Sequence, residues 1–124
     1  MAPKQVVSSD KGLKSNLFSQ ATIHNGTIFV SGNIGIVPST MKVVEGSVAD
    51  RTKQALENIR MVLEEAGSSF EKLLKVLPSS IGDLEIIPDP KPARTCVCVK
   101  ELPFKTDVEI EVIAALGETA GPKL

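Results

Sequence analysis

Residues 47–67, SVADRTKQALENIRMVLEEAG, carry the strongest structural signal in the chain. Small and apolar residues recur there at alternating steps of four and three, so they share one stripe of a helix. These residues are Val48, Thr52, Ala55, Ile59, Val62 and Ala66. Ser47 can cap the first turn, Asp50 suits the positive end of the helix dipole, and Gly67 follows the last periodic residue. The stretch predicts a helix over Val48 to Ala66 with one buried face.

Strands are predicted on both sides of this helix. Ala21 to His24 and Thr27 to Ser31 flank Asn25-Gly26, the strongest short signal for a two-residue hairpin turn. Near the C-terminus, Arg94 to Lys100 and Val108 to Ala114 both alternate between apolar and polar residues. A short loop joins these last two stretches, so we expect them to be adjoining strands.

Each C-terminal stretch has one face suited to a core and one mixed or polar face. The apolar faces carry Thr95, Val97 and Val99 on the first strand and Val108, Ile110, Val112 and Ala114 on the second. The opposite faces carry Arg94, Cys96, Cys98 and Lys100 on the first strand and Glu109, Glu111 and Ile113 on the second. No crossover helix separates these strands, and a single helix stripe must cover one sheet face. The predicted fold class is therefore α+β, as a single domain over residues 1–124.

The segment from Val76 to Pro92 breaks this regular pattern, because it contains Pro78, Pro88, Pro90 and Pro92 together with Gly82. Proline removes backbone donors and restricts the preceding residue, so no long helix is expected here. At most, Leu84 to Ile87 forms a short extended piece. A connection of this length without regular structure indicates a functional loop or lost structure.

Composition excludes several classes of function. The chain has 124 residues and a formal charge of −1, and Lys and Arg are not clustered, so a nucleic-acid partner is not expected. No apolar run is long enough for a membrane helix, so no membrane partner is expected either. Two cysteines spaced as Cys96-x-Cys98 make a poor zinc site, so we expect neither a metal nor a cofactor. We interpret the single histidine, His24, as a surface strand residue.

The remaining candidates for chemistry are Arg94, Glu109, Glu111 and the backbone around Ser31-Gly32. An arginine can hold a carboxylate through two parallel hydrogen bonds. A glutamate can orient a water and accept its proton, and a glycine lets a ligand approach the main chain. The alternative is that these charges are solvated cross-strand pairs contributing about 0.2–1 kcal/mol, and the residue pattern alone favours that alternative.

Five segments together resemble one known family. They are FSQA at 18–21, FVSGNIG at 29–35, RTKQALENI at 51–59, PARTCV at 92–97 and VEIEVIA at 108–114. In this order they resemble the Rid, or YjgF, family of reactive-intermediate deaminases, also called the perchloric-acid-soluble endoribonuclease family. The block PARTC followed by EIEVIA is the most specific part of this resemblance.

The resemblance implies a chorismate-mutase-like fold, a homotrimer with clefts between neighbouring subunits, and hydrolysis of 2-aminoacrylate and 2-iminobutanoate to 2-oxo acids and ammonia. By position, Arg94 and the main chain of Gly32 would hold the carboxylate of this small 2-imino acid ligand. Glu109 and the carbonyl of Cys96 would position the attacking water, and Ser31 would line the cleft. Phe18 stands where the family commonly has tyrosine.

The chain also departs from the family pattern. The span between Lys75 and Pro92 is about a dozen residues short, so the family's second helix is expected to be shortened or lost. The competing hypothesis is therefore a non-catalytic trimer of the same family that binds a ligand, acts like a chaperone or inhibits translation. A ribonuclease is the weakest alternative. The expected location is cytoplasmic, with only weak signals for mitochondria or, from the final PKL, peroxisomes.

Overall fold

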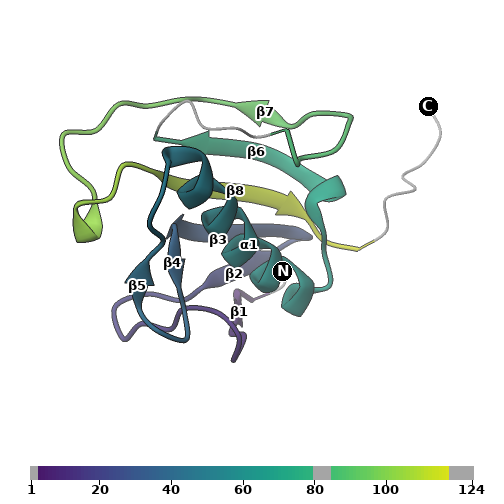
Figure 1. The fold of residues 1–124 in the computed structure, drawn as a ribbon. Coiled ribbons are helices and arrows are strands. Elements are labelled where there is room, and N and C mark those ends of the chain that lie inside the picture. The colour runs from purple at the N-terminus through teal and green to yellow at the C-terminus, as the bar shows by residue number, and fades with distance from the viewer. Residues whose placement is uncertain (1–2, 80–84, 118–124) are drawn as a thin grey trace.

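A six-stranded mixed sheet forms the centre of the fold (Figure 1). The computed structural model describes residues 3–79 and 85–117. The strands run in the order β1 (Gln5–Val7), β2 (Ala21–His24), β3 (Thr27–Ile34), β8 (Glu109–Ala115), β6 (Leu73–Pro78) and β7 (Ala93–Arg94). All neighbours are antiparallel except β6 and β7, which are parallel. A second, two-stranded sheet pairs β4 (Ile36–Val37) with β5 (Lys42–Val43).

The predicted helix is confirmed residue for residue as α1 (Val48–Ala66). The Ser47 side chain accepts a hydrogen bond from the Asp50 amide, and the Asp50 carboxylate accepts one from the Ser47 amide at 2.9 Å. Gly67 ends the helix with a φ of 84°, a left-handed conformation that glycine adopts without steric cost. Local capping chemistry therefore sets both ends.

Helix α1 packs on one face of the sheet, where β3 and β8 lie behind it (Figure 1). The buried residues of α1 are Thr52, Ala55, Leu56, Asn58, Ile59, Val62 and Leu63. They meet the face of β8 that carries Ile110, Val112 and Ala114, all fully buried as the alternation predicts. On the opposite sheet face Phe29 is 47% exposed. The α+β fold class with a single helix is thus confirmed for the described residues.

The predicted hairpin is also confirmed. Asn25 and Gly26 form the turn between β2 and β3, with φ values of 49° and 78°. Strand β3 continues to Ile34, three residues beyond the predicted end. This extension brings the last residue of β3, Ile34, opposite the first residue of β8, Glu109.

The prediction that Arg94–Lys100 and Val108–Ala114 adjoin is wrong. Strand β6 lies between them, pairing with β8 on one side and β7 on the other. Within Arg94–Lys100, only Arg94 belongs to a regular strand, as the second residue of β7. The amides of Thr95 and Val97 still donate hydrogen bonds to carbonyls of β6. No helix in the described residues covers this edge, so Val97 and Val99 are 42% and 45% exposed. The predicted apolar core face of this stretch is therefore absent.

The segment from Val76 to Pro92 is partly as predicted. Its described residues contain no helix, and its first three belong to β6. Leu84 falls outside the described residues, and Glu85 and Ile86 form a turn rather than an extended piece. Ile87 is 2% exposed and joins the hydrophobic core. A single isoleucine thus anchors the described part of this segment to the core.

Asn58 on α1 fixes the path of the chain between β3 and β4. Its amide nitrogen donates to the carbonyls of Ile34 and Ile36 at 3.2 and 2.7 Å, in a buried position. Gly35 lies between these residues, and a Cβ there would come within 2.6 Å of the Arg51 carbonyl oxygen. At Gly35, the backbone between β3 and β4 therefore packs directly against the backbone of α1.

Replacing Asn58 with leucine is expected to lower the free energy of unfolding by about 2–4 kcal/mol, because two buried carbonyls lose a donor. Urea unfolding followed by circular dichroism measures the change. Gln54→Ala is the matched control, because Gln54 donates only to the Asn58 side chain, so its loss should cost less than about 1 kcal/mol. Equal unfolding free energies for wild type and Asn58→Leu would contradict this role.

Candidate active site

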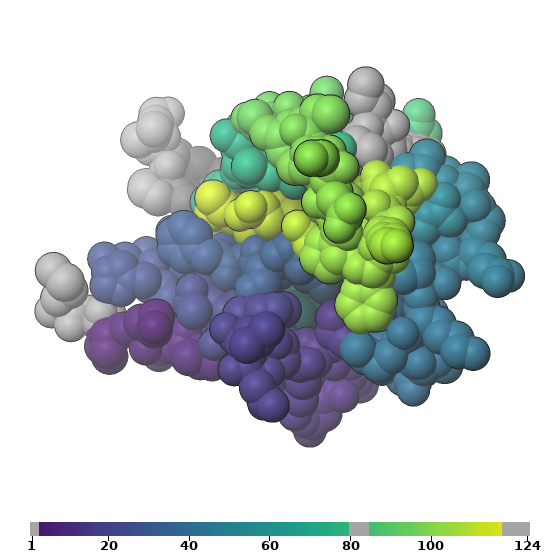
Figure 2. Space-filling model, turned by 90° about the vertical axis from the view of Figure 1, so that its left-hand side faces the viewer, coloured from purple at the N-terminus to yellow at the C-terminus, as the bar shows by residue number. Residues whose placement is uncertain are grey.

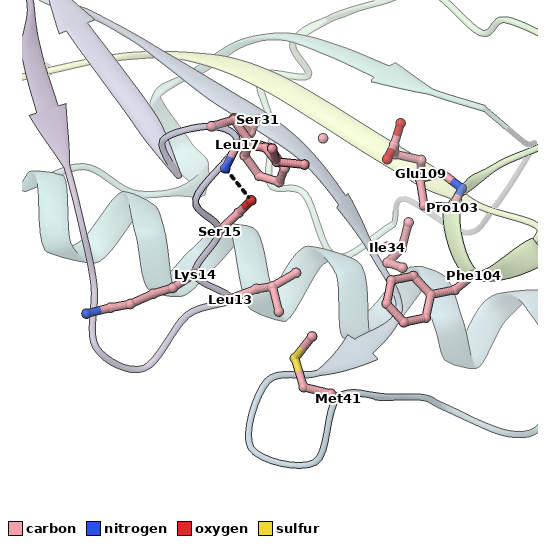
Figure 3. Close-up of a pocket in the computed structure, with 12 residues that line it drawn as sticks. Leu13, Lys14, Ser15, Leu17, Ser31, Ile34, Met41, Pro103, Phe104 and Glu109 are labelled. Carbon is pink, nitrogen blue, oxygen red and sulfur yellow. Dashed lines mark hydrogen bonds between the residues drawn. The ribbon is translucent and has the colours of Figure 1, made fainter.

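A cleft of about 570 Å³ opens between the N-terminal loop, β3, the β4–β5 hairpin and the segment before β8 (Figure 3). Its lining residues are Leu13, Lys14, Ser15, Leu17, Phe18, Ser31, Gly32, Ile34, Met41, Pro103, Phe104 and Glu109. In the space-filling view the hollow lies between the dark-purple N-terminal loop and the yellow-green segment that precedes β8 (Figure 2). The volume falls within the range of small-molecule sites.

A β-bulge brings Glu109 and Gly32 together at one side of this cleft. The register between β3 and β8 slips between Val30 and Asn33, so Ser31 and Gly32 are not paired with β8. A Cβ on Gly32 would lie 2.9 Å from the carboxyl carbon of Glu109. Only glycine therefore lets this carboxylate lie against the β3 backbone. Bulges of this kind are frequent beside active sites because they re-aim side chains.

The N-terminal loop that closes the other side is held by Gln20. Its side chain accepts from the Ser9 amide at 2.6 Å and donates to the carbonyls of Ser9 and Leu13 at 3.1 and 3.0 Å. The Ser31 hydroxyl donates to the Ser19 carbonyl at 2.6 Å. Only 8% of the Gln20 surface is exposed to solvent. The loop thus forms a fixed wall of the cleft.

Glu109 is held at the start of β8 by contacts on both sides. Its amide donates to the Ser79 hydroxyl at 2.7 Å, and its carbonyl accepts from the Ser79 amide at 2.9 Å. Two residues earlier, Asp107 accepts two hydrogen bonds from the Arg51 guanidinium at 2.7 and 2.8 Å. These bonds orient the strand that presents the carboxylate.

The electrostatics of the cleft favour a basic carboxylate. Partial burial raises the pKa of Glu109 above its usual value, and the nearby negative charge of Glu111 raises this pKa further. A carboxylate with a raised pKa is a stronger base than an exposed one. Lys14 also lines the cleft, but its ammonium pairs with Asp10 at 2.6 Å. The cleft therefore combines one activated carboxylate with largely apolar walls.

Replacing Glu111 with glutamine is expected to lower the pKa of Glu109, because a repelling charge is removed. An NMR titration of the Glu109 side-chain carboxyl carbon measures this pKa. The folded-state pKa lies above the unfolded one, so ionised Glu109 destabilises the fold. This destabilisation is absent below the ordinary carboxyl pKa and grows as the pH rises through the raised pKa. Glu45→Gln, away from the cleft, is the control, and an unchanged pKa in Glu111→Gln would contradict the charge coupling.

The predicted site residues fall into two groups. Phe18, Ser31, Gly32 and Glu109 lie together in the cleft. Arg94, with Cys96 two residues further on, is exposed and does not line it. Arg94 and Glu109 are two strand spacings apart across the sheet, which is about 10 Å. Along the strand direction they are offset by about three residues, which is another 10 Å or so. Within one chain the guanidinium and the carboxylate are not neighbours, which corrects the expectation that they stand on adjoining strands.

Arg94 and Cys96 instead lie on the free edge of the sheet. The amides of Thr95 and Val97 point toward β6, so the backbone groups of the residue between them, Cys96, point away from it. The Cys96 carbonyl is therefore presented at the open edge beside Arg94. An exposed edge of this kind is suited to contact with another chain.

Met41 and Phe104 line the cleft from two loops and were not among the predicted site residues. Both have left-handed backbones, with φ of 58° and 59°. The usual signal for such a position is glycine or asparagine, and neither residue type stands here. The sequence therefore contained no signal that would have found them.

The described residues contain neither a metal-binding cluster nor a membrane-spanning helix. No group of three or more metal-ligating side chains is found there, and Cys96 and Cys98 are free thiols. No helix within residues 3–79 and 85–117 is long and apolar enough to cross a bilayer.

A mixed sheet covered on one face by a single helix, with a carboxylate cleft at a β-bulge, defines a chorismate-mutase-like α+β protein. Residues 12–78 match the family described as Endoribonuclease L-PSP, and the chain belongs to this family, also called Rid or YjgF. The resemblance inferred from the five sequence segments is thereby confirmed.

Relatives and solved structures agree with this assignment. The chain is 41% identical to the protein mmf1, mitochondrial, of Schizosaccharomyces pombe, over 92% of this chain and 77% of that protein. It is 37% identical to a protein of Rattus norvegicus named 2-iminobutanoate/2-iminopropanoate deaminase, over 95% of this chain and 96% of that protein. The crystal structure of yeast Mmf1 superposes with a TM-score of 0.81 at 31% identity, covering 93% of this chain and all of that one.

Proposed function

We propose that this protein is an imine deaminase that hydrolyses 2-iminobutanoate and related 2-imino acids to 2-oxo acids and ammonia. The observation that carries the proposal is the partly buried Glu109 carboxylate, with its raised pKa, lying against Gly32 in a cleft of ligand size. The rat relative at 37% identity, named for this activity, supports it.

The chemistry needs little beyond orientation and proton transfer. Ionised Glu109 orients a water and takes its proton as the water oxygen bonds to the imine carbon. The proton taken by Glu109 passes to the imine nitrogen, which gives an intermediate that carries an OH and an NH2 group on the same carbon. The hydroxyl then gives its proton to the NH2 group as the carbon–nitrogen bond breaks, so the nitrogen leaves as ammonia and the oxygen becomes the carbonyl of the 2-oxo acid. Glycine at position 32 leaves the β3 backbone open to the substrate. A positioned general base of this kind typically contributes about 10²–10⁴-fold to the rate.

The substrate carboxylate needs a cation, and the lysine that lines the cleft of a single chain, Lys14, is paired with Asp10. Arg94, whose guanidinium can bind a carboxylate through two hydrogen bonds, lies at the sheet edge. We propose that the protein assembles as a homotrimer in which a neighbouring copy brings Arg94 and the Cys96 carbonyl to the cleft. The guanidinium would bind the carboxylate through two hydrogen bonds, and the carbonyl would accept one from the attacking water. The complete site then belongs to two chains.

Ammonia release from freshly generated 2-iminobutanoate tests the proposal. The wild-type protein should accelerate release well above the rate in buffer, and equal rates would overturn the deaminase. Saturable binding of a small 2-oxo acid without turnover would instead favour the non-catalytic ligand-binding alternative, which the apolar lining of the cleft also allows.

The location of the protein is a separate question. One relative is named as mitochondrial and another, from Arabidopsis thaliana, as chloroplastic. Cytoplasmic location remains a prediction, which imaging of the tagged full-length protein would test.

A further inference from the structure

The two cysteines of the chain lie two residues apart at the edge of the sheet, just after its outermost strand β7 (Figure 1). Cys96 and Cys98 are both exposed free thiols. The amides of Thr95 and Val97 alternately donate to carbonyls of β6, so this segment is extended. Side chains two residues apart on an extended segment point to the same face. The two thiols are therefore neighbours, and the proposed function uses neither of them.

The spacing of the two cysteines places a disulfide between them just within reach. An extended segment rises by about 3.3 Å per residue, which puts their Cα atoms about 6.6 Å apart. Cysteines joined by a disulfide usually have Cα atoms about 4.4–6.8 Å apart, and most often near 6 Å. Forming the bond would therefore bend the backbone at Val97, the residue between them. An exposed and strained disulfide is easily reduced, which suits reversible regulation.

The backbone at Val97 is connected to both parts of the proposed active site. Arg94 lies three residues earlier on the same edge segment. The Val97 amide donates to the Pro78 carbonyl at 3.2 Å, and the next residue, Ser79, holds Glu109. The Ser79 amide donates to the Glu109 carbonyl at 2.9 Å, and its hydroxyl accepts from the Glu109 amide at 2.7 Å. A bend at Val97 would therefore displace the arginine and disturb the support of the carboxylate.

We propose that Cys96 and Cys98 form a reversible redox site, at which a hydroperoxide converts the two thiols to a disulfide and thereby lowers the activity of the protein. The effect on activity rests on the proposed deaminase function, whereas the formation of the disulfide does not. Hydrogen peroxide is smaller than the imino acid that must reach Arg94 in the assembly. A neighbouring copy that leaves room for the substrate therefore also leaves room for the oxidant.

The reaction moves two electrons from the sulfur atoms to the peroxide. One thiol gives up its proton as its sulfur attacks a peroxide oxygen. The oxygen–oxygen bond breaks, leaving a sulfenic acid, and the released hydroxide takes the proton to form water. The second sulfur then attacks the sulfenic sulfur, and the departing hydroxyl takes the second thiol proton to form another water. A dithiol reductant reverses the reaction by thiol–disulfide exchange.

Intact-mass analysis and ammonia release from 2-iminobutanoate, before and after treatment with hydrogen peroxide, test the proposal on the full chain. The oxidised chain should be lighter by two hydrogen atoms. Its kcat/KM should fall about 10²-fold, since a displacement of about 1 Å at an active site costs this much. Dithiothreitol should restore both. Native-state hydrogen exchange should be faster at the Val97 amide of the oxidised chain, because its hydrogen bond to Pro78 is weakened.

Cys98→Ser is the matched control, because Cys98 has no part in the proposed active site. This variant should keep the wild-type kcat/KM, form no internal disulfide and stay active after peroxide treatment. Equal inactivation of Cys98→Ser and wild type, or bonds between chains in place of the internal disulfide, would overturn the redox site.

Two further outcomes separate the redox site from the deaminase. An internal disulfide that leaves both kcat/KM and Val97 exchange unchanged would overturn the switch and leave the deaminase standing. A reduced wild type that releases no ammonia would overturn the deaminase. The mass and the Val97 exchange rate would then still decide whether the disulfide forms and bends the edge segment.

Discussion

Glu109→Gln is expected to lower kcat for imine hydrolysis by about 10²–10⁴-fold, because the amide cannot accept a proton from water. Glutamine has nearly the same shape, so the packing against Gly32 is kept. The folded state should be no less stable than wild type near neutral pH, since the raised pKa of Glu109 means that its ionised form is disfavoured by folding. A large loss of activity without a loss of stability is the expected signature.

Steady-state ammonia release and thermal unfolding, measured on the same preparations, check this prediction. Glu111→Gln is the matched control, because Glu111 stands on the same strand but does not line the cleft. It should keep activity near neutral pH, and its acid limb should move to lower pH as the pKa of Glu109 falls. Wild-type turnover in Glu109→Gln would remove Glu109 from the mechanism.

Arg94→Ala is expected to reduce kcat/KM about 100-fold or more, because two charge-assisted hydrogen bonds to the substrate carboxylate are lost. Arg94→Lys should fall between wild type and alanine, since lysine keeps the charge but not the paired geometry. Arg94 is exposed on the sheet edge, so neither change should lower the melting temperature of the chain. Kinetics with 2-iminobutanoate measure the effect, with Lys100→Ala as a control for general loss of charge. Unchanged kcat/KM in Arg94→Ala would exclude a role in binding.

The parts of the fold that were predictable are those set by local chemistry. Helix α1 begins and ends where Ser47 and Gly67 cap it, and the β2–β3 turn follows from Asn25-Gly26. The alternation of apolar and polar residues predicted a strand over Val108–Ala114, and the structure places β8 one residue later, at Glu109–Ala115. Each of these signals lies within a few residues of the structure that it predicts.

The errors arose where distant segments meet. Alternation in Arg94–Lys100 predicted a core-facing strand, but the side of a strand that becomes buried depends on what covers it, and no described helix covers β7. The short loop between Arg94–Lys100 and Val108–Ala114 suggested that these two stretches pair with each other. Strand β6, from the middle of the chain, pairs with β8 instead. Pairing between strands far apart in sequence leaves no local signal.

The candidate site divides in the same way. Family motifs indicated Phe18, Ser31, Gly32 and Glu109, and the hairpin, the bulge and β8 bring these four together. Met41 and Phe104 were missed because a left-handed backbone at a methionine or a phenylalanine has no sequence signature. Arg94 lies apart from these four because β6 inserts between β7 and β8. Its approach to the cleft of a neighbouring copy is part of the proposed trimer.

Mixing two inactive variants tests most directly whether the site is shared between chains. Arg94→Ala and Glu109→Gln subunits are unfolded together, refolded at equal amounts and assayed for ammonia release from 2-iminobutanoate. If each cleft joins Glu109 of one copy to Arg94 of the next, half of the carboxylates and half of the arginines are intact, and activity should return to about a quarter of wild type. Activity no greater than the average of the two separate variants would contradict a site built from two chains.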